Sequence, residues 1–375
     1  MDVTDSNLRR QERAIFELRK LYEQYGYKKY KMSKFEEYGL YLENKSFLSS
    51  QQVITFTDLN GRLMALKPDV TLSIAKNAPV EPTEPEKLYY NENVYRTPHG
   101  SNEYREIMQV GLECLGEIDL YTQYEVVLLA CKSLQKLSED NLMVLSDMGF
   151  VSGLLENCGV SPAVGEKILQ CVGHKNAHEV ARICRNAGVA EDLRDRLTAL
   201  TTLYGDFTET LEKAETLVIN DKMRQSLGQL RVLANLISPE PESARLKLDF
   251  SVINDLTYYN GLIFQGFIGE VPTAILSGGR YDNLMEKLGK KTQAIGFAVY
   301  TDQLERCDEA LERYDVDALL IYEPQVDKTK LSAAVKMLTA NGRRVRVQNT
   351  GTQKLRYKQL LRLTDGGLEI LETND

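Results

Sequence analysis

The first part of the chain has the apolar pattern of one long helix. Apolar residues repeat there every three or four positions, namely Leu8, Ile15, Leu18, Tyr22 and Tyr25. Gly26 follows at the point where such a helix would end. We therefore predict an amphipathic helix that begins near residue 8 and stops at Gly26.

The next hundred residues read as strands. The stretch VITFTDLNGRLMAL (53–66) places Asn60 and Gly61 between two runs rich in strand-forming residues, which indicates a hairpin. Asp69 follows and is suited to cap a helix that runs through Lys76. The segments KLYYNENVYR (87–96) and EIMQVGLECLG (106–116) are joined by a polar loop and predict an antiparallel pair.

The strand pattern stops near Leu120 and resumes after Glu242. Between these residues Leu, Val and Ala recur at helical spacing, so we expect a helical insertion at about 120–242. Four strand-like segments follow, which are LKLDFSV, LIFQGFI, TAILS and AIGFAVY. We interpret GGRYDNLMEKLG (278–289) as a turn that leads into a helix. The sheet would then be split in the sequence.

The last sixty residues alternate between the two periods. We predict the order strand, helix, strand, helix, strand, in the segments VDALLIY, KLSAAVKMLTANG, RVRVQ, KLRYKQLLRL and LEILE. This order is typical of a small α/β domain, which we assign to 315–375 with a boundary near 314. The basic stretch RRVRV (343–347) is interpreted as an exposed strand edge rather than an RNA contact.

Composition restricts the function. A net charge of −8 and a sequence pI near 5.3 argue against a broad, sequence-independent grip on nucleic acid. No apolar run approaches the ~18 residues of a membrane span, so we expect a cytoplasmic protein without membrane association. The six cysteines include no CxxC pair and are expected to be reduced thiols.

One short stretch suggests a binding pocket without chemistry. NDLTYYNGLIFQGF (254–267) sets two tyrosines beside a glycine and offers no base, nucleophile or cation. Taken alone, Tyr258 and Tyr259 are better interpreted as core aromatics of a buried strand. His174 and His178 have no partners that complete a metal site, and we interpret them as solvated helix residues. The chain lacks a GxxxxGK loop, and we expect no cofactor and no metal.

An ordered set of motifs covers most of the chain and resembles one family. The motifs are LKPDVT (66–71), VYR with REIMQVGLE (94–113), LTYYNGLIFQGF (256–267), SGGRYDNLMEKLG (277–289) and AIGFAVYTDQL (294–304). Together they resemble the class II synthetase core of histidyl-tRNA synthetase and its paralogues. The resemblance implies an α+β fold, with a class II synthetase-like antiparallel sheet flanked by helices over 1–314. Residues 315–375 would form a truncated anticodon-binding-like domain.

The resemblance also implies a pocket for free histidine. Asp69, Thr71 and Gln109 would hold the ammonium group, because it offers donors to carboxylate, hydroxyl and amide oxygens. Glu113 and Tyr259 would address the imidazole, and Tyr258 and Tyr281 would close its apolar sides. The complete predicted histidine-binding set is Asp69, Thr71, Arg96, Gln109, Glu113, Tyr258, Tyr259, Gly279 and Tyr281.

The parts needed to activate histidine are altered. Active members of the family carry an arginine in the segment that matches 253–257 and another at the end of their third motif, where this chain has Asn254 and Gln303. The loop after Arg96 reads Thr97, Pro98, His99 and lacks the family's acidic residue. Adenylation needs cations to neutralise charge that develops on ATP, so we expect no catalytic residues and almost no adenylation.

Among the paralogues, this profile resembles the regulatory subunits of ATP phosphoribosyltransferase. The resemblance implies a non-catalytic subunit that activates a short-form catalytic subunit in the first step of histidine biosynthesis. Its implied partners are that catalytic subunit in a hetero-octamer, a second copy of this chain through residues 8–40, and histidine as the feedback effector. Ser33 replaces the proline usual in that dimer contact, and tRNA binding is not expected. The alternatives are an active histidyl-tRNA synthetase and a stand-alone histidine- or tRNA-binding paralogue.

Overall fold

The computed structural model describes most of the chain. The described residues are 8–44, 53–79, 84–97, 103–253, 258–304, 314–340, 342–349, 355–364 and 366–374. They form two compact units, Met1–Glu305 and Arg306–Asp375, so the division falls a few residues before the boundary expected near 314.

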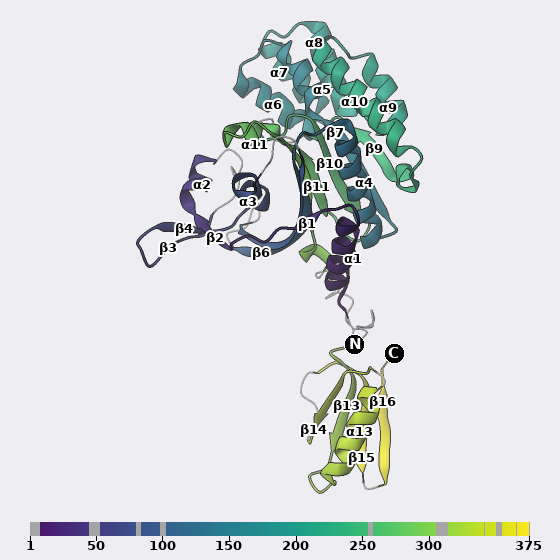
Figure 1. The fold of residues 1–375 in the computed structure, drawn as a ribbon. Coiled ribbons are helices and arrows are strands. Elements are labelled where there is room, and N and C mark those ends of the chain that lie inside the picture. Colours follow the sequence, from purple (N-terminus) through teal and green to yellow (C-terminus); the bar gives the residue numbers. More distant parts are fainter. Residues whose placement is uncertain are drawn as a thin grey trace. The chain divides into compact units, whose positions relative to one another are not determined.

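The N-terminal unit is built on one large sheet (Figure 1). Its nine strands in spatial order are β1 (Lys28–Lys29), β5 (Glu86–Arg96), β6 (Arg105–Gly116), β12 (Gln293–Tyr300), β11 (Leu276–Arg280), β10 (Leu262–Ile268), β7 (Asn141–Asp147), β9 (Leu246–Asp249) and β8 (Tyr204–Asp206). Every neighbouring pair is antiparallel except β1 with β5 and β7 with β9. The split sheet and the antiparallel pair β5–β6 predicted from the sequence are confirmed.

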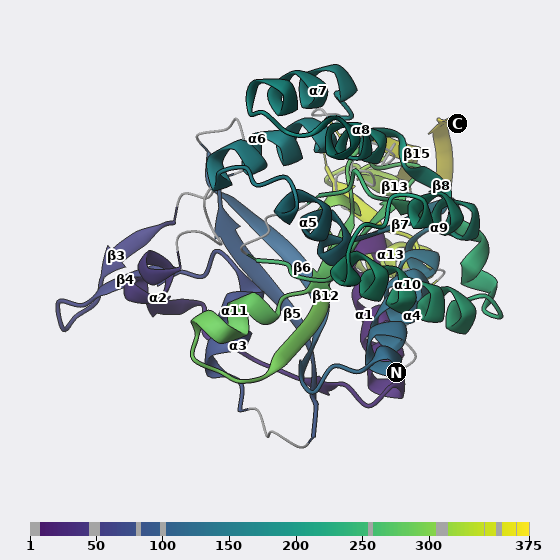
Figure 2. The same cartoon turned by 90° about the horizontal axis from the view of Figure 1, so that it is seen from above.

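Two helices cover one face of this sheet. They are α1 (Arg10–Gln24) and α4 (Leu120–Leu137), and Figure 2 shows them on the side of β5 and β12 opposite to α3 and α11. Tyr22 of α1 packs edge-on against Phe297 of β12 with 5.9 Å between ring centroids. The helix predicted before Gly26 is therefore confirmed, and Gly26 itself has the positive φ of 82° that suits a glycine after a helix end.

Smaller elements cover the opposite face. These are α2 (Tyr38–Glu43), α3 (Val70–Asn77), α11 (Asp282–Lys287) and a three-stranded sheet of β2 (Phe35–Glu37), β4 (Leu63–Leu66) and β3 (Thr55–Thr57). The hairpin β3–β4 turns at Asn60 and Gly61 as predicted and projects from the unit (Figure 1). Asp69 caps α3, because its Oδ1 accepts from the Leu72 backbone N–H at 2.7 Å.

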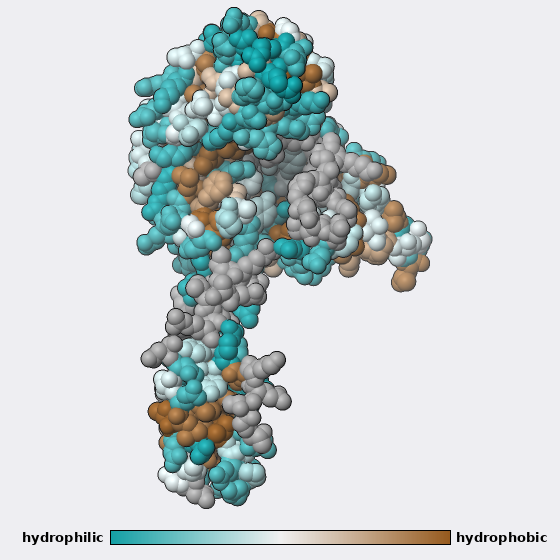
Figure 3. Space-filling view, turned by 180° about the vertical axis from the view of Figure 1, so that it is seen from behind, coloured by the Kyte–Doolittle hydropathy of each residue, from teal (hydrophilic) through white to brown (hydrophobic). Residues whose placement is uncertain are grey.

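The region expected to be a helical insertion also contributes to the main sheet. Its helices after α4 are α5 (Met148–Glu156), α6 (Pro162–Gly173), α7 (Ala177–Asn186), α8 (Glu191–Ala199), η3 (Leu200–Thr202), α9 (Phe207–Glu215), α10 (Asp221–Ile237) and η4 (Pro241–Arg245). Strand β7 lies within the same region and pairs with β10 and β9. Consecutive residues of β7 are buried on both faces, so its apolar run carries no period-two signal. At the top of Figure 3, where these helices lie, the surface is largely hydrophilic.

Strand β11 differs from the expected turn. Gly278 and Gly279 lie inside the strand and pair with Phe297 and Gly296 of β12, and the helix α11 begins only at Asp282. A Cβ at Gly278 would lie 2.4 Å from the Cβ of Phe297. Close packing between β11 and β12 therefore requires these glycines, and they do not form the turn that the sequence predicted.

In its described residues, the C-terminal unit is a four-stranded sheet packed against one helix. Its strands in spatial order are β14 (Val345–Gln348), β13 (Val316–Tyr322), β15 (Tyr357–Thr364) and β16 (Gly367–Thr373), and its helix is α13 (Lys328–Ala340). The predicted helix KLRYKQLLRL is wrong, because residues 357–364 form β15. Leu361 and Leu363 of β15 point into the core at a spacing of two, and β16 returns alongside as a hairpin.

Three smaller expectations concern side chains and helices. The cysteines at positions 114, 131, 158, 171 and 184 are free, and Cys307 lies outside the described residues. His174 follows α6 and His178 lies on α7, so the two histidines do not share one helix as the sequence suggested. Within the described ranges, every helix is too short or too polar to cross a lipid bilayer.

Candidate functional site

The predicted site residues meet on the face of the main sheet that carries α3 and α11. Gln109 and Glu113 lie four positions apart on β6 and therefore share one face, and the hydrogen bond between Glu113 and Thr71 of α3 shows that it is this face. Opposite Glu113 the register places Leu88 of β5 and Gly296 of β12, and Gly279 follows on β11. Four strands therefore bring residues from distant parts of the sequence into one row.

Glu113 is the centre of a buried hydrogen-bond group. Thr71, at the start of α3, donates its hydroxyl to Oε1 at 2.7 Å, and Tyr281 donates to Oε2 at 2.5 Å. The side chain is 1% exposed. Burial raises the pKa of Glu113 to about 8. The hydrogen bonds from Thr71 and Tyr281 favour the charged carboxylate and lower the pKa, but burial outweighs them. Burial therefore favours the protonated form of this carboxyl group at neutral pH.

A glycine on the neighbouring strand makes room for Glu113. A Cβ at Gly296 would lie 1.8 Å from the Oε2 of Glu113 and 2.5 Å from the backbone oxygen of Leu112. Any larger side chain would collide with the carboxyl group and with backbone that cannot move away. The orientation of Glu113 therefore depends on Gly296 as well as on its two hydroxyl donors.

Three tyrosines line one side of the site. Tyr258 lies 4.4 Å from Tyr259 and 5.7 Å from Tyr281, measured between ring centroids. Tyr259 also lies against Gly279, where a Cβ would come within 2.8 Å of the tyrosine ring. The structure thus brings together Tyr258, Tyr259, Gly279 and Tyr281 as an aromatic wall beside Glu113.

The polar end of the site contains Asp69, Arg96 and Gln109. Burial raises the pKa of Asp69, while its helix-capping bond and the charge of Arg96 lower it. Gln109 is 5% exposed and lies opposite Glu92 of β5 and Tyr300 of β12. An acidic group and an amide oxygen at one end are suited to an ammonium ion.

A buried ion pair supports this end. Lys67 is fully buried and its Nζ lies 3.1 Å from the Oε2 of Glu92. Burial lowers the pKa of Lys67, and the charges of Glu92, Glu36 and Asp69 partly offset that effect. Glu92 stands opposite Gln109 in the strand register, so the ion pair adjoins this end of the site. Sequence reasoning missed Lys67, Glu92 and Gly296, and only the strand register could have indicated the last two.

The residues that distinguish this chain from the active family fall partly within the structure. Gln303 is neutral, and its Oε1 accepts from the Thr273 hydroxyl at 3.2 Å. Thr97 is buried at the end of β5. Asn254, Pro98 and His99 lie outside the described residues.

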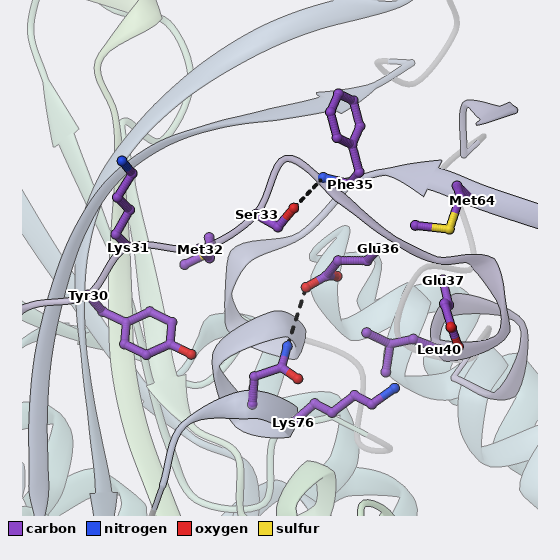
Figure 4. Close-up of a pocket in the computed structure, with 11 residues that line it drawn as sticks. Tyr30, Lys31, Met32, Ser33, Phe35, Glu36, Glu37, Leu40, Met64 and Lys76 are labelled. Carbon is purple, nitrogen blue, oxygen red and sulfur yellow. Dashed lines mark hydrogen bonds between the residues drawn. The ribbon is translucent and has the colours of Figure 1, made fainter. Parts of the chain in front are cut away.

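A separate groove lies at the other end of α3. It has a volume of about 450 Å³ and is lined by residues that include Tyr30, Ser33, Phe35, Glu36 and Lys76 (Figure 4). Figure 4 shows the Ser33 hydroxyl bonded to the Phe35 N–H at 3.1 Å. None of the predicted histidine-binding residues is among its lining residues. The groove and the site are therefore distinct.

Comparison with known proteins identifies the family. Residues 1–304 match the family model for histidyl-tRNA synthetase. The chain belongs to the histidyl-tRNA synthetase family. Among curated relatives, it is 27% identical over 321 residues to the ATP phosphoribosyltransferase regulatory subunit of Acetivibrio thermocellus, covering 83% of this chain and 77% of that one. The identity is 29% to the protein of the same name from Clostridium acetobutylicum, over 88% and 83% of the two chains.

Solved structures share the fold of this family member. A Bacillus halodurans chain described as an ATP phosphoribosyltransferase regulatory subunit/histidyl-tRNA synthetase has a TM-score of 0.75 at 22% identity, covering 94% and 93% of the two chains. Histidyl-tRNA synthetase from Nostoc gives 0.70 at 16% identity, over 94% and 87%. A chain of the ATP phosphoribosyl transferase (HisG:HisZ) complex from Thermotoga maritima gives 0.61 at 17%, over 80% and 98%. The predicted class II synthetase-like α+β fold is confirmed.

Proposed function

We propose that this chain is a non-catalytic regulatory subunit of ATP phosphoribosyltransferase, which activates a short catalytic subunit in the first step of histidine biosynthesis. The curated relatives that carry this name match over more than four fifths of the chain. The observation that carries the proposal is the buried hydrogen-bond group around Glu113, together with a neutral Gln303 where the resemblance to active synthetases implies a catalytic arginine. Such a site is suited to bind an amino acid and poorly suited to adenylate it.

Free histidine is the ligand we propose for the pocket. Asp69, Thr71 and Gln109 would accept from its ammonium group, with Arg96 near its carboxylate. Glu113 and Tyr259 would pair with the two imidazole nitrogens, and Tyr258 and Tyr281 would pack on the ring. The buried position of Glu113 supports this arrangement, since a partner with titratable nitrogens can share its proton.

The pocket would serve feedback inhibition. An effector acts only by binding one conformational state better than another, so histidine would favour the state of the complex in which the catalytic subunit is inactive. We propose a hetero-octamer with the short catalytic subunit, built on a homodimer of this chain through residues 8–40, and no role for tRNA. The free cysteines fit the reducing cytoplasm.

Reconstitution tests the function. The purified chain is mixed with a short-form ATP phosphoribosyltransferase catalytic chain, and phosphoribosyl-ATP formation is measured with and without histidine. We expect activity to rise about tenfold or more on mixing and to fall again when histidine is added. Absence of a complex, together with unchanged activity, would contradict the proposal. Sedimentation of this chain alone checks the homodimer.

A further inference from the structure

A buried hydroxyl on the floor of the site has no protein partner among the described residues. Tyr90 of β5 is 0% exposed, and its hydroxyl oxygen makes no hydrogen bond with that part of the chain. Burial raises its pKa well above the ordinary tyrosine value, so the group remains a neutral O–H. Burying a hydroxyl without a partner costs free energy, and such groups are uncommon in folded proteins.

The register fixes where this hydroxyl lies. Tyr90 is the cross-strand partner of Gly111 on β6, so its side chain points to the same face as Gln109 and Glu113. A Cβ at Gly111 would come within 2.5 Å of the Tyr90 hydroxyl oxygen and 2.7 Å of its Cζ. The hydroxyl therefore lies directly above Gly111.

This position is midway along the proposed ligand. Gly111 is two residues from Gln109 on one side and two from Glu113 on the other, and all three share one face of β6. Gln109 belongs to the ammonium end of the site and Glu113 to the imidazole end. Tyr90 also packs in the same core cluster as Tyr258, Tyr259 and Tyr281, the residues of the aromatic wall.

We propose that Tyr90 is a further ligand-contacting residue, whose hydroxyl forms a hydrogen bond with the bound amino acid between its ammonium and imidazole groups. The inference rests on the proposed histidine pocket and extends it. The bound ligand would supply the hydrogen-bond partner that the Tyr90 hydroxyl lacks, and this hydrogen bond would increase the affinity for the ligand. In the unliganded protein the hydroxyl does not contribute to folding stability. Tyr90 would thereby favour a short, polar amino acid over an apolar one of the same size.

The test removes one oxygen atom. In Tyr90→Phe we expect the affinity for histidine, measured by calorimetry, to fall about 3- to 30-fold. The thermal unfolding midpoint of the unliganded variant should stay equal to that of the wild type or rise, because an unpaired buried hydroxyl is lost. The combination of weaker binding with undiminished stability is the result that a purely structural role would not give.

Tyr89→Phe is the matched control. Tyr89 is the next residue on the same strand and equally buried, but its hydroxyl donates to the Oε1 of Glu23 at 2.7 Å on the opposite face of the sheet. This change should lower the unfolding midpoint slightly and leave histidine binding unchanged.

The possible results distinguish a failure of the Tyr90 contact from a failure of the proposed histidine binding. If the wild type binds histidine and Tyr90→Phe binds it equally well, the ligand contact is refuted and the pocket stands. A loss of binding that accompanies a clear loss of stability in Tyr90→Phe assigns the hydroxyl a structural role and also refutes the contact. A wild type that ignores histidine, alone and in complex with the catalytic chain, overturns both the pocket and the role of Tyr90.

Discussion

The proton on Glu113 follows from where its side chain lies. Two hydroxyl donors at 2.7 and 2.5 Å would stabilise a carboxylate, yet burial outweighs them and raises the pKa to about 8. In the unfolded chain the same group has a pKa near 4.5. Between these two values the folded protein holds one more proton than the unfolded chain, so folding stability depends on pH.

Glu113→Gln should flatten this dependence. Since the folded state binds the extra proton, the free energy of unfolding of the wild type should fall as pH rises from about 5 to 8, by up to about 1.4 kcal/mol per pH unit. The amide imitates the protonated acid and does not titrate, so the variant should be at least as stable as the wild type at pH 8. Urea unfolding at several pH values measures both slopes. Equal slopes in the two proteins would show that Glu113 is ionised in the fold.

Histidine binding should be more sensitive to Glu113 than to Tyr259. Glu113→Gln keeps the size of the side chain but removes a group that can share a proton with imidazole, a charge-assisted bond of about 1.5 to 3 kcal/mol, or roughly a tenfold to hundredfold loss in affinity. Tyr259→Phe removes one hydroxyl and should cost about 0.5 to 1.5 kcal/mol. Calorimetric titration gives the order. The reverse order would place the imidazole elsewhere in the pocket.

Gly296→Ala, on the neighbouring strand β12, should abolish ligand binding at the site. Its methyl group would meet the Oε2 of Glu113 and the backbone of β6, so Glu113 must move and the strand pairing must loosen. We expect a loss of stability of about 1 to 3 kcal/mol and loss of histidine binding. Gly228→Ala is the control, because no atom lies within 4 Å of a Cβ there, and the helix α10 should gain up to about 1 kcal/mol. Normal histidine binding by Gly296→Ala would show that the site does not need Glu113 in this position.

At the scale of the element, helix α3 serves the site through its first turn. Thr71 donates to Glu113, and Asp69 caps the helix and is proposed to bind the ammonium group of the ligand. The sequence indicated the cap and the resemblance indicated the ligand role, and the two roles are compatible in one carboxylate. The two roles of Asp69 can be separated by mutation, because the ligand contact needs the negative charge of the carboxylate and the helix cap does not.

Asp69→Asn and Asp69→Ala should separate cap from ligand contact. Asparagine is a good N-cap, so Asp69→Asn should change stability little while histidine affinity falls about tenfold or more. Asp69→Ala also loses the cap and should cost about 1 kcal/mol of stability in addition. Thermal unfolding and calorimetry on the same two variants provide the comparison. If Asp69→Asn binds histidine normally, Asp69 is a cap only.

The individual helices and strands show which local sequence signals were sufficient to predict secondary structure. The Asn60-Gly61 hairpin and the capped helix after Asp69 carry local signals, and both were predicted correctly. Strand β15 was predicted as a helix, because its leucines at 360, 361 and 363 fit either period. Tertiary packing decided the outcome, with Leu361 and Leu363 in the core and β16 paired beside them. Gly278 and Gly279 were assigned to a turn for a similar reason, since a glycine pair does not reveal whether it allows a bend or a close approach.

At the scale of the whole N-terminal unit, the site depends on the split sheet. Strands β5 and β6 come from one end of the sequence and β11 and β12 from the other, and they meet so that Glu113 faces Gly296. The motifs could identify the polar and aromatic residues, since each motif has a recognisable order. They could not identify Tyr90 or Gly296, because the importance of these residues arises from the register between strands that are distant in the chain.

The same unit should bind histidine without activating it. Activation requires the histidine carboxylate to attack ATP while cations neutralise charge on the phosphates, and removing one charge-stabilising donor alone costs about 3 kcal/mol of barrier. Gln303 is neutral and its amide oxygen accepts a hydrogen bond from Thr273, and the resemblance implies that Asn254 stands where active family members carry a second arginine. We expect histidine-dependent pyrophosphate exchange far below the ~1 to 10 per second of an active enzyme.

Gln303→Arg alone should not restore this exchange activity, since catalytic groups that act together do not contribute additively. Exchange at a normal rate by the wild-type chain would instead identify an active histidyl-tRNA synthetase and refute the regulatory function.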